Sequence, residues 1–93
     1  MGKSVLQSER ECFICGTTVN LEEHHCLHGA GNRKLAEKYG LKVMLCAQCH
    51  RGGSGVHFNR GLDLKLKKYA QTYWESNIGT REGFMRTFGK SYL

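Results

Sequence analysis

Four of the five cysteines in the chain form two Cys-x-x-Cys pairs, Cys12 with Cys15 and Cys46 with Cys49. Each such turn places two sulfur atoms on one side of a tight backbone loop, and four thiolates make a closed tetrahedral zinc site. The spacing therefore predicts a structural Zn²⁺ held by these four residues. The fifth cysteine, Cys26, has no partner at this spacing, and we interpret it as a small buried side chain rather than a metal ligand.

The histidines are left for other chemistry once the cysteines are assigned to zinc. His24 and His25 are adjacent, and neighbouring residues on a strand point to opposite faces, so one can ligate a metal ion while the other addresses a water molecule. An unperturbed imidazole titrates near pH ~6.5 and can therefore accept a proton at neutral pH. Together with His50 and His57, the pair indicates a second, catalytic metal site. His28 could substitute as a ligand, but we interpret it as a loop histidine near phosphate.

The same cysteines could instead form disulfides, which are typical of small secreted domains. The chain begins MGKSVLQSERE, which lacks the apolar segment of a secretory signal. We therefore expect a reducing, cytoplasmic location, where thiols stay free to bind zinc. No apolar run approaches the roughly 18 residues of a membrane-spanning helix, so no membrane contact is expected.

The charge balance points to a polyanionic partner. The chain carries 14 Lys and Arg against 8 Asp and Glu, a formal net charge of +6 over 93 residues. This excess favours nucleic acid over a neutral metabolite. Guanidinium and ammonium groups can bind the phosphates of a nucleic-acid backbone. Each such residue could instead be an ordinary charged side chain on the solvated surface. The candidates are Arg33 and Lys34, beside glycines, and Arg51 and Arg60, which flank the segment between the last two histidines.

Two strands and a short helix are predicted to position the first histidines. The first cysteine pair follows a polar arm or short helix of residues 1–11, and leads into a strand that ends at the histidine pair. Residues 41–46, LKVMLC, are apolar enough for a second strand that enters the second cysteine pair. Between the strands, Asn32 is the expected N-cap of a helix over residues 33–39, which Gly40 ends.

A glycine-rich loop and two helices are predicted for the rest of the chain. Residues 50–61 are rich in glycine and are expected to form a loop that carries the later histidines. A helix then starts at Leu62, with a buried stripe formed by Leu62, Leu66, Tyr69, Ala70, Tyr73 and Trp74 and a solvated face that includes Lys65, Lys68 and Thr72. A final helix is expected between Thr80 and Gly89, with inward side chains from Phe84, Met85 and Phe88.

We expect a single α+β domain over residues 1–93. A chain of this size builds a marginal core on its own, and zinc at a four-cysteine site typically adds on the order of 10 kcal/mol of folding free energy. We therefore expect little fold without zinc.

The cysteine pairs, the segment EEHHCLHG and the segment LCAQCH together resemble the HNH family of nucleases, over residues 12–60. The resemblance implies a zinc-stabilised ββα-metal fold (the His-Me finger), with residues 61–93 as additional C-terminal helices. GVHFNRG and the final TREGFMRTFGKSYL resemble small phage or prophage proteins of this type. A phage-encoded protein would act in the cytoplasm of the host cell.

The resemblance also implies roles for the histidines. His24 and His50 would bind the catalytic cation, which could be Mg²⁺, Mn²⁺, Ni²⁺ or Zn²⁺, and His25 would be the general base that activates water. His57 would be a further metal ligand, and its alternative is a substrate-contacting or buried histidine. The implied reaction is the hydrolysis of DNA, leaving a 5′-phosphate and a 3′-hydroxyl. A protein partner or a homodimer is compatible with this reading.

One position departs from the family pattern. Leu41 stands where an asparagine that orients the base histidine is expected, and Asn32 could supply the same restraint. Without such a restraint the enzyme would be slow, selective or dependent on a partner. The alternative function is a zinc-stabilised nucleic-acid-binding module that does not cut, although such a module has no need of clustered histidines.

Overall fold

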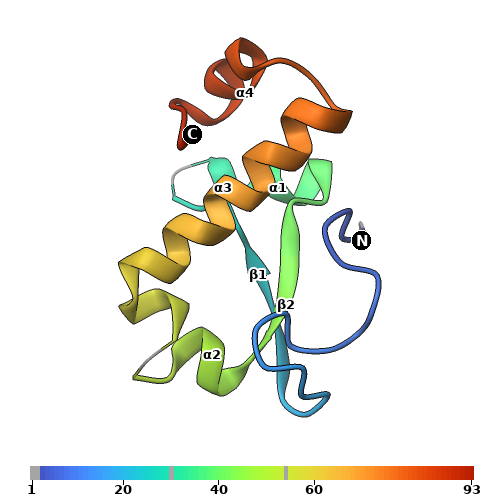
Figure 1. The fold of residues 1–93 in the computed structure, drawn as a ribbon, viewed down its shortest axis with the longest axis vertical. Coiled ribbons are helices and arrows are strands. Elements are labelled where there is room, and N and C mark those ends of the chain that lie inside the picture. The colour runs from blue at the N-terminus through green and yellow to red at the C-terminus, as the bar shows by residue number, and fades with distance from the viewer. Residues whose placement is uncertain (1–2, 30, 54) are drawn as a thin grey trace.

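The computed structural model describes residues 3–29, 31–53 and 55–93. The first two residues of the predicted N-terminal arm, and Ala30 and Ser54 in predicted loops, lie outside this description. The fold is α+β, as predicted, with a two-stranded antiparallel sheet and helices (Figure 1). Its elements in chain order are β1 (Leu21–His25), α1 (Asn32–Tyr39), β2 (Lys42–Cys46), α2 (Ala47–Arg51), the 3₁₀ helix η1 (Val56–Phe58), α3 (Arg60–Asn77) and α4 (Arg81–Phe88).

The register of the two strands determines which sites lie at which end of the sheet. Leu21 pairs with Cys46, so the start of β1 lies beside the second cysteine pair. At the other end of the sheet, His25 pairs with Lys42. Both strands were predicted, but β2 starts at Lys42, one residue later than the apolar run LKVMLC suggests.

Helix α1 starts differently from the prediction. Its N-cap is Gly31, in the left-handed region with φ 83°, and no side chain caps the helix. Asn32 is therefore the first helical residue, and its Nδ2 donates to the carbonyl of Phe88, 3.2 Å away, which ties α1 to α4. Gly40 ends the helix as predicted, with φ 72°, and a Cβ there would lie 2.6 Å from the carbonyl oxygen of Lys3. Only glycine fits both constraints at this position.

The segment predicted as a glycine-rich loop contains two short helices. As predicted, the segment is not one regular helix, but His50 lies on α2 and His57 lies on η1 rather than in the loop that was expected to carry them. Helix α2 forms because Sγ of Cys46 accepts a hydrogen bond from the backbone N–H of Cys49, which caps the first turn. Three of the segment's glycines, Gly52, Gly53 and Gly55, lie in the connection between α2 and η1, and the fourth, Gly61, lies in the first turn of α3.

Helix α3 links two parts of the molecule, because it packs against η1 near its start and against α4 near its end (Figure 1). It begins at Arg60, earlier than predicted, because the Oδ1 of Asn59 accepts a hydrogen bond from the backbone N–H of Leu62 at 3.0 Å. None of the described helices is long and apolar enough to cross a bilayer.

The predicted apolar stripes are mostly buried, with two exceptions. Tyr69 is 44% exposed, because its ring lies outside the helical core and packs against Phe13 with 5.3 Å between ring centroids. Met85 is also 44% exposed, and its predicted inward position is wrong. The core of the helical half is aromatic instead: the ring of Trp74 packs edge-on against those of Phe84 and Phe88.

Candidate metal centres and active site

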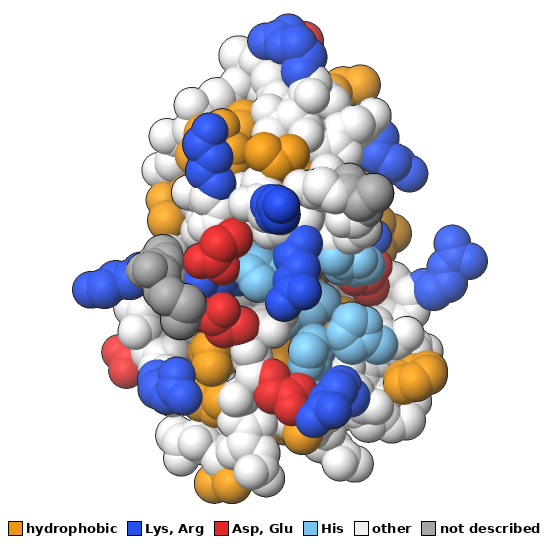
Figure 2. Space-filling model, turned by 180° about the vertical axis from the view of Figure 1, so that it is seen from behind, with side chains coloured by type: hydrophobic (Ala, Val, Ile, Leu, Met, Phe, Trp, Pro, Cys, Tyr) orange, Lys and Arg blue, Asp and Glu red, His pale blue; other side chains and the backbone are white. Residues whose placement is uncertain are grey.

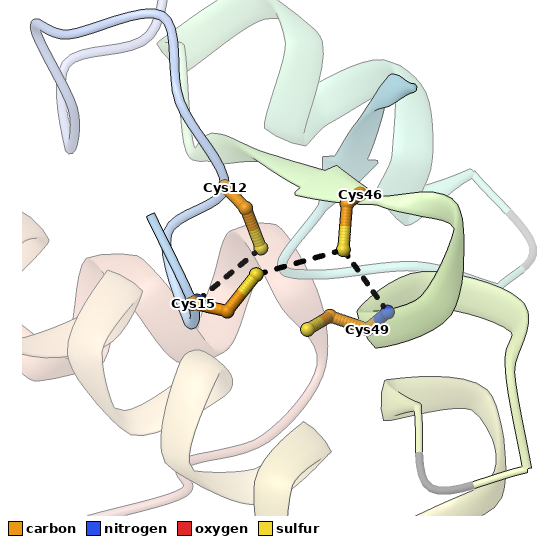
Figure 3. Close-up of side chains that lie close together, drawn as sticks. All are labelled: Cys12, Cys15, Cys46 and Cys49. Carbon is orange, nitrogen blue, oxygen red and sulfur yellow. Dashed lines mark hydrogen bonds between the residues drawn. The ribbon is translucent and has the colours of Figure 1, made fainter. Parts of the chain in front are cut away.

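The four paired cysteines converge on one point, as the spacing predicted (Figure 3). Their Sγ atoms all lie within 4.8 Å of one another, and Sγ of Cys15 is 3.7 Å from Sγ of Cys46. A disulfide would require a separation of about 2.0 Å. A tetrahedron with zinc–sulfur bonds of about 2.3 Å has sulfur–sulfur edges of about 3.8 Å. The observed spacing therefore fits a zinc ion and not a disulfide.

The two cysteine turns have the same internal geometry. The backbone N–H of Cys15 donates to Sγ of Cys12, and that of Cys49 donates to Sγ of Cys46, both at 3.5 Å. Such donors stabilise thiolates, which are the form that binds zinc. Cys26 is fully buried elsewhere in the core, as predicted, and burial raises the pKa of its thiol to about 12.

The acidities of the clustered thiols show why a cation belongs among them. Burial by itself would raise the pKa of Cys12, but backbone N–H groups, including that of Cys15, outweigh it and lower the pKa to about 6. Burial and the neighbouring sulfur atoms raise the pKa of Cys49 to about 12. One thiolate forms readily while further ionisation is opposed, so a full set of four thiolates needs a bound cation to balance it.

A second cluster contains the histidines predicted to bind the catalytic metal. His24 on β1, His50 on α2 and His57 on η1 bring ring nitrogens within 4.8 Å of one another. The Nε2 atoms of His50 and His57 are 2.9 Å apart. Because Cys49 and His50 are consecutive on α2, the cysteine cluster positions one member of the histidine cluster directly.

The buried ring of His24 has features that would suit a metal ligand. The residue is 3% exposed, and its Nε2 is the one buried side-chain nitrogen or oxygen atom of the described residues that has no hydrogen-bond partner. Burial, followed by the proximity of the other histidines, lowers the pKa of His24 to about 3, so the ring is neutral at physiological pH. Burial likewise lowers the pKa of His57. A neutral imidazole can give a ring-nitrogen lone pair to a divalent transition metal, so these residues fit a cation.

A carboxylate orients His50. Oε1 of Glu22 is 2.7 Å from Nδ1 of His50, which leaves Nε2 directed toward His57. Hydrogen bonds from His50 and Arg51 lower the pKa of Glu22 and keep it ionised. This carboxylate–histidine arrangement is typical of metal-ligating histidines.

His28 lies in the loop between β1 and α1, as interpreted, and its ring is close to the histidine cluster. Its ring centroid is 5.9 Å from that of His24 and 6.4 Å from that of His57, and its Nε2 is 2.9 Å from Oδ1 of Asp63. Burial alone would raise the pKa of Asp63, but His28 and Lys67 outweigh it and lower the pKa. The contact with Asp63 joins segments far apart in the sequence, and no spacing pattern indicates it.

His25, the predicted general base, lies apart from the three clustered rings. Its Nε2 is 2.8 Å from Oε1 of Glu37 on α1, and Glu37 in turn accepts hydrogen bonds from the buried ammonium of Lys42. Neither Glu37 nor Lys42 is among the site residues predicted from the sequence. Asn32, which could have restrained His25, donates to the Phe88 carbonyl instead, and Glu37 contacts the ring of His25.

The side chains of His24 and His25 nevertheless line the same hollow. It has a volume of about 280 Å³ and is lined by Glu23, His24, His25, His28, Arg33, His50 and His57. Histidine side chains gather on this face, with lysine, arginine and carboxylate side chains around them (Figure 2). A group of phosphate size in this hollow would face both the clustered rings and the predicted base.

The four side chains predicted to contact phosphate lie at different places relative to the hollow. Arg33 lines it, while Lys34 lines an adjoining groove with His25. Arg60 lines a small neighbouring pocket beside His57. Arg51 is held in an ion pair by Glu22, with its Nε 3.0 Å from the carboxylate. Arg33 is therefore the cation best placed to contact a bound phosphate.

Comparison with known proteins adds no relative to this picture. No protein-family model, curated protein or solved structure matches the chain. The arrangement of the cysteines and histidines is therefore the basis for assigning a function.

Proposed function

We propose that this protein is a metal-dependent endonuclease of the HNH type that hydrolyses DNA phosphodiester bonds and leaves a 5′-phosphate and a 3′-hydroxyl. The observation that carries the proposal is the buried, unpartnered Nε2 of His24, which lies beside His50 and His57. A buried polar atom without a partner is costly and is unusual unless a ligand satisfies it. A zinc-stabilised module that only binds nucleic acid does not need such an unsatisfied nitrogen.

The three clustered histidines would hold the catalytic cation, which could be Mg²⁺, Mn²⁺, Ni²⁺ or Zn²⁺. Such an ion, when bound, stabilises the negative charge that develops on a scissile phosphate and its leaving oxygen. Glu22 orients His50 toward this position through Nδ1. The four-cysteine zinc would be structural, since it keeps no open coordination position.

His25 would take the proton of the attacking water. When Nε2–H donates to Glu37, the neutral ring carries its lone pair on Nδ1, which is then the basic atom. Arg33 lines the same hollow and would hold the phosphate against this base. The net charge of +6 supports DNA as the polyanion that is bound.

A plasmid-nicking assay tests this function. Zinc-loaded parent and His25→Ala are compared with each of the four metals, at equal zinc content, and Asn77→Ala at the exposed C-terminal end of α3 serves as a surface control. We expect metal-dependent nicks that DNA ligase reseals, and a loss of about 10²- to 10⁴-fold in rate for His25→Ala, which is the range of a general base. Asn77→Ala should nick at the parental rate.

Two results would overturn the proposal. Salt-sensitive DNA binding without cleavage in any metal would favour the zinc-stabilised binding module. Nicking that persists at the parental rate in His25→Ala would remove the assigned base and point to a contaminating nuclease.

A further inference from the structure

A buried lysine lies next to the predicted general base. Lys42 is 2% exposed and sits directly across the sheet from His25 in the strand register. Lysines are almost never fully buried unless they are paired, because removing the ammonium from water is costly. The contacts of Lys42 therefore indicate what its charge does.

The ammonium of Lys42 binds two carboxylates. Its Nζ is 2.9 Å from both oxygens of Glu37 and 3.0 Å from Oε2 of Glu23. Burial by itself would lower the pKa of Lys42, but Glu37 and then Glu23 outweigh it and raise the pKa, so the side chain stays charged. Glu23, His25 and Glu37 are close enough to hold a metal ion, but Lys42 already supplies a positive charge among them.

The bidentate contact with Lys42 restrains the carboxylate of Glu37. With both oxygens bound to one ammonium, the carboxylate has little freedom to rotate. Its Oε1 lies 2.8 Å from Nε2 of His25, whose side chain is only 9% exposed. A carboxylate in this position favours the ring tautomer with the proton on Nε2.

We propose, building on the nuclease function above, that Glu37 is a positioning residue for His25 and that Lys42 holds Glu37 in place. Glu37 selects the tautomer of His25 that leaves Nδ1 basic, and it fixes the plane of the ring. The contacts among these three residues join three elements, because Glu37 lies on α1, His25 on β1 and Lys42 on β2. It performs the orienting role that neither Leu41, which is buried in the core, nor Asn32 supplies.

NMR of isotope-labelled imidazole nitrogens tests the positioning without relying on activity. In the zinc-loaded parent, His25 should show a single neutral tautomer protonated at Nε2, and in Glu37→Gln it should shift toward a mixture of tautomers. Glu82→Gln, the same change at an exposed position in the first turn of α4, is the control and should leave His25 unaltered. A parent ring protonated at Nδ1, or a tautomer unchanged in Glu37→Gln, would overturn the inference.

Kinetics supply the second readout. Glu37→Gln should lower kcat for nicking by about 10- to 100-fold with little change in KM, because His25 contributes to the reaction step and not to DNA binding. Lys42→Met should lower kcat less, since Glu37 remains but is no longer restrained. Lys38→Met, on the exposed face of α1, should match the parent.

The outcomes separate this inference from the proposed function. If the parent nicks and Glu37→Gln nicks with the parental kcat, the positioning role is wrong and the nuclease stands. If the parent does not nick with any metal, the nuclease proposal fails, and the tautomer of His25 still decides whether Glu37 positions the ring.

Discussion

His24 illustrates how a side chain can be unfavourable for folding and yet suited to binding a ligand. Its ring is buried among three other histidine rings, and Nε2 has no partner among the described residues. An unsatisfied buried polar group costs about 1–3 kcal/mol of folding free energy. That cost is recovered only when something binds to the nitrogen.

Replacing His24 with leucine tests this at the level of one side chain. Urea denaturation is measured with zinc at the cysteines and no second metal. The free energy of unfolding of His24→Leu should equal that of the parent or exceed it by up to about 1–3 kcal/mol, because the unsatisfied nitrogen is gone. Added Ni²⁺ should raise the Tm of the parent and not that of the variant. Thr72→Leu, on the solvated face of α3, should respond to Ni²⁺ as the parent does. A variant that Ni²⁺ stabilises as strongly as the parent would show that His24 is not a ligand.

At the scale of elements, helix ends decide where the histidines lie. Cys46 is the last residue of β2, a member of the four-cysteine cluster that could hold zinc, and the N-cap of α2, so one side chain sets the start of the helix that carries His50. Asn59 ends η1, which carries His57, and caps α3. The histidine cluster therefore depends on two caps that lie outside it.

The cap at Asn59 can be tested directly. Asn59→Ala should lower the free energy of unfolding by about 1 kcal/mol, because the backbone N–H of Leu62 loses its acceptor. Asn77→Ala makes the same change near the other end of α3, where the side chain only bonds the carbonyl of Tyr73, and should cost less than about 0.5 kcal/mol. Urea denaturation of both zinc-loaded variants measures the difference. Equal losses would contradict the capping role.

At the scale of the whole molecule, the cysteine cluster adds to the hydrogen bonds, such as that from the backbone N–H of Phe13 to the carbonyl of Met44, that join the N-terminal segment to the sheet. Cys12 and Cys15 come from a segment without helix or strand, and Cys46 and Cys49 come from the end of the sheet and from α2. Phe13, between the first pair, packs on Tyr69 of α3. A metal at the cysteines would therefore hold the N-terminal segment, the sheet and the helical half together.

Removing the zinc should remove the fold. Zinc binding at such a site is worth about 10 kcal/mol or more, which is comparable to the whole stability of a small domain. We expect chelation, or Cys46→Ser, to abolish the helical far-UV signal and the cooperative unfolding transition. Cys26→Ala is the matched control: it should keep its zinc and lose about 1–2 kcal/mol through the cavity that is left.

Measurements of zinc content and circular dichroism on the same samples check this prediction. A zinc-free chain that still unfolds cooperatively would show that the apolar core suffices. Loss of zinc from Cys26→Ala would assign the metal to the wrong cysteines.

Local patterns predicted the elements well and their ends less well. The strands, α1, α3 and α4 follow from hydrophobic period and from Gly40 and Gly89, because these signals act within a few residues. The helices α2 and η1 were missed, since the glycines around them are typical of a loop and the cap of α2 is a cysteine sulfur atom. Tyr69 and Met85 have the right period for burial, but the neighbouring elements leave those positions partly open.

The sequence by itself determined the chemistry that is available: four cysteines spaced for zinc, an adjacent histidine pair, two later histidines and a basic surface charge. The convergence of the cysteines into one cluster, and of His24, His50 and His57 into another, followed from assigning each set to one ion. The carboxylates that orient the histidines were decided only by the tertiary structure. Glu22, Glu37 and Asp63 reach His50, His25 and His28 across separations that no local spacing encodes, and the ammonium of Lys42 is buried because strand register and α1 bring two carboxylates to it.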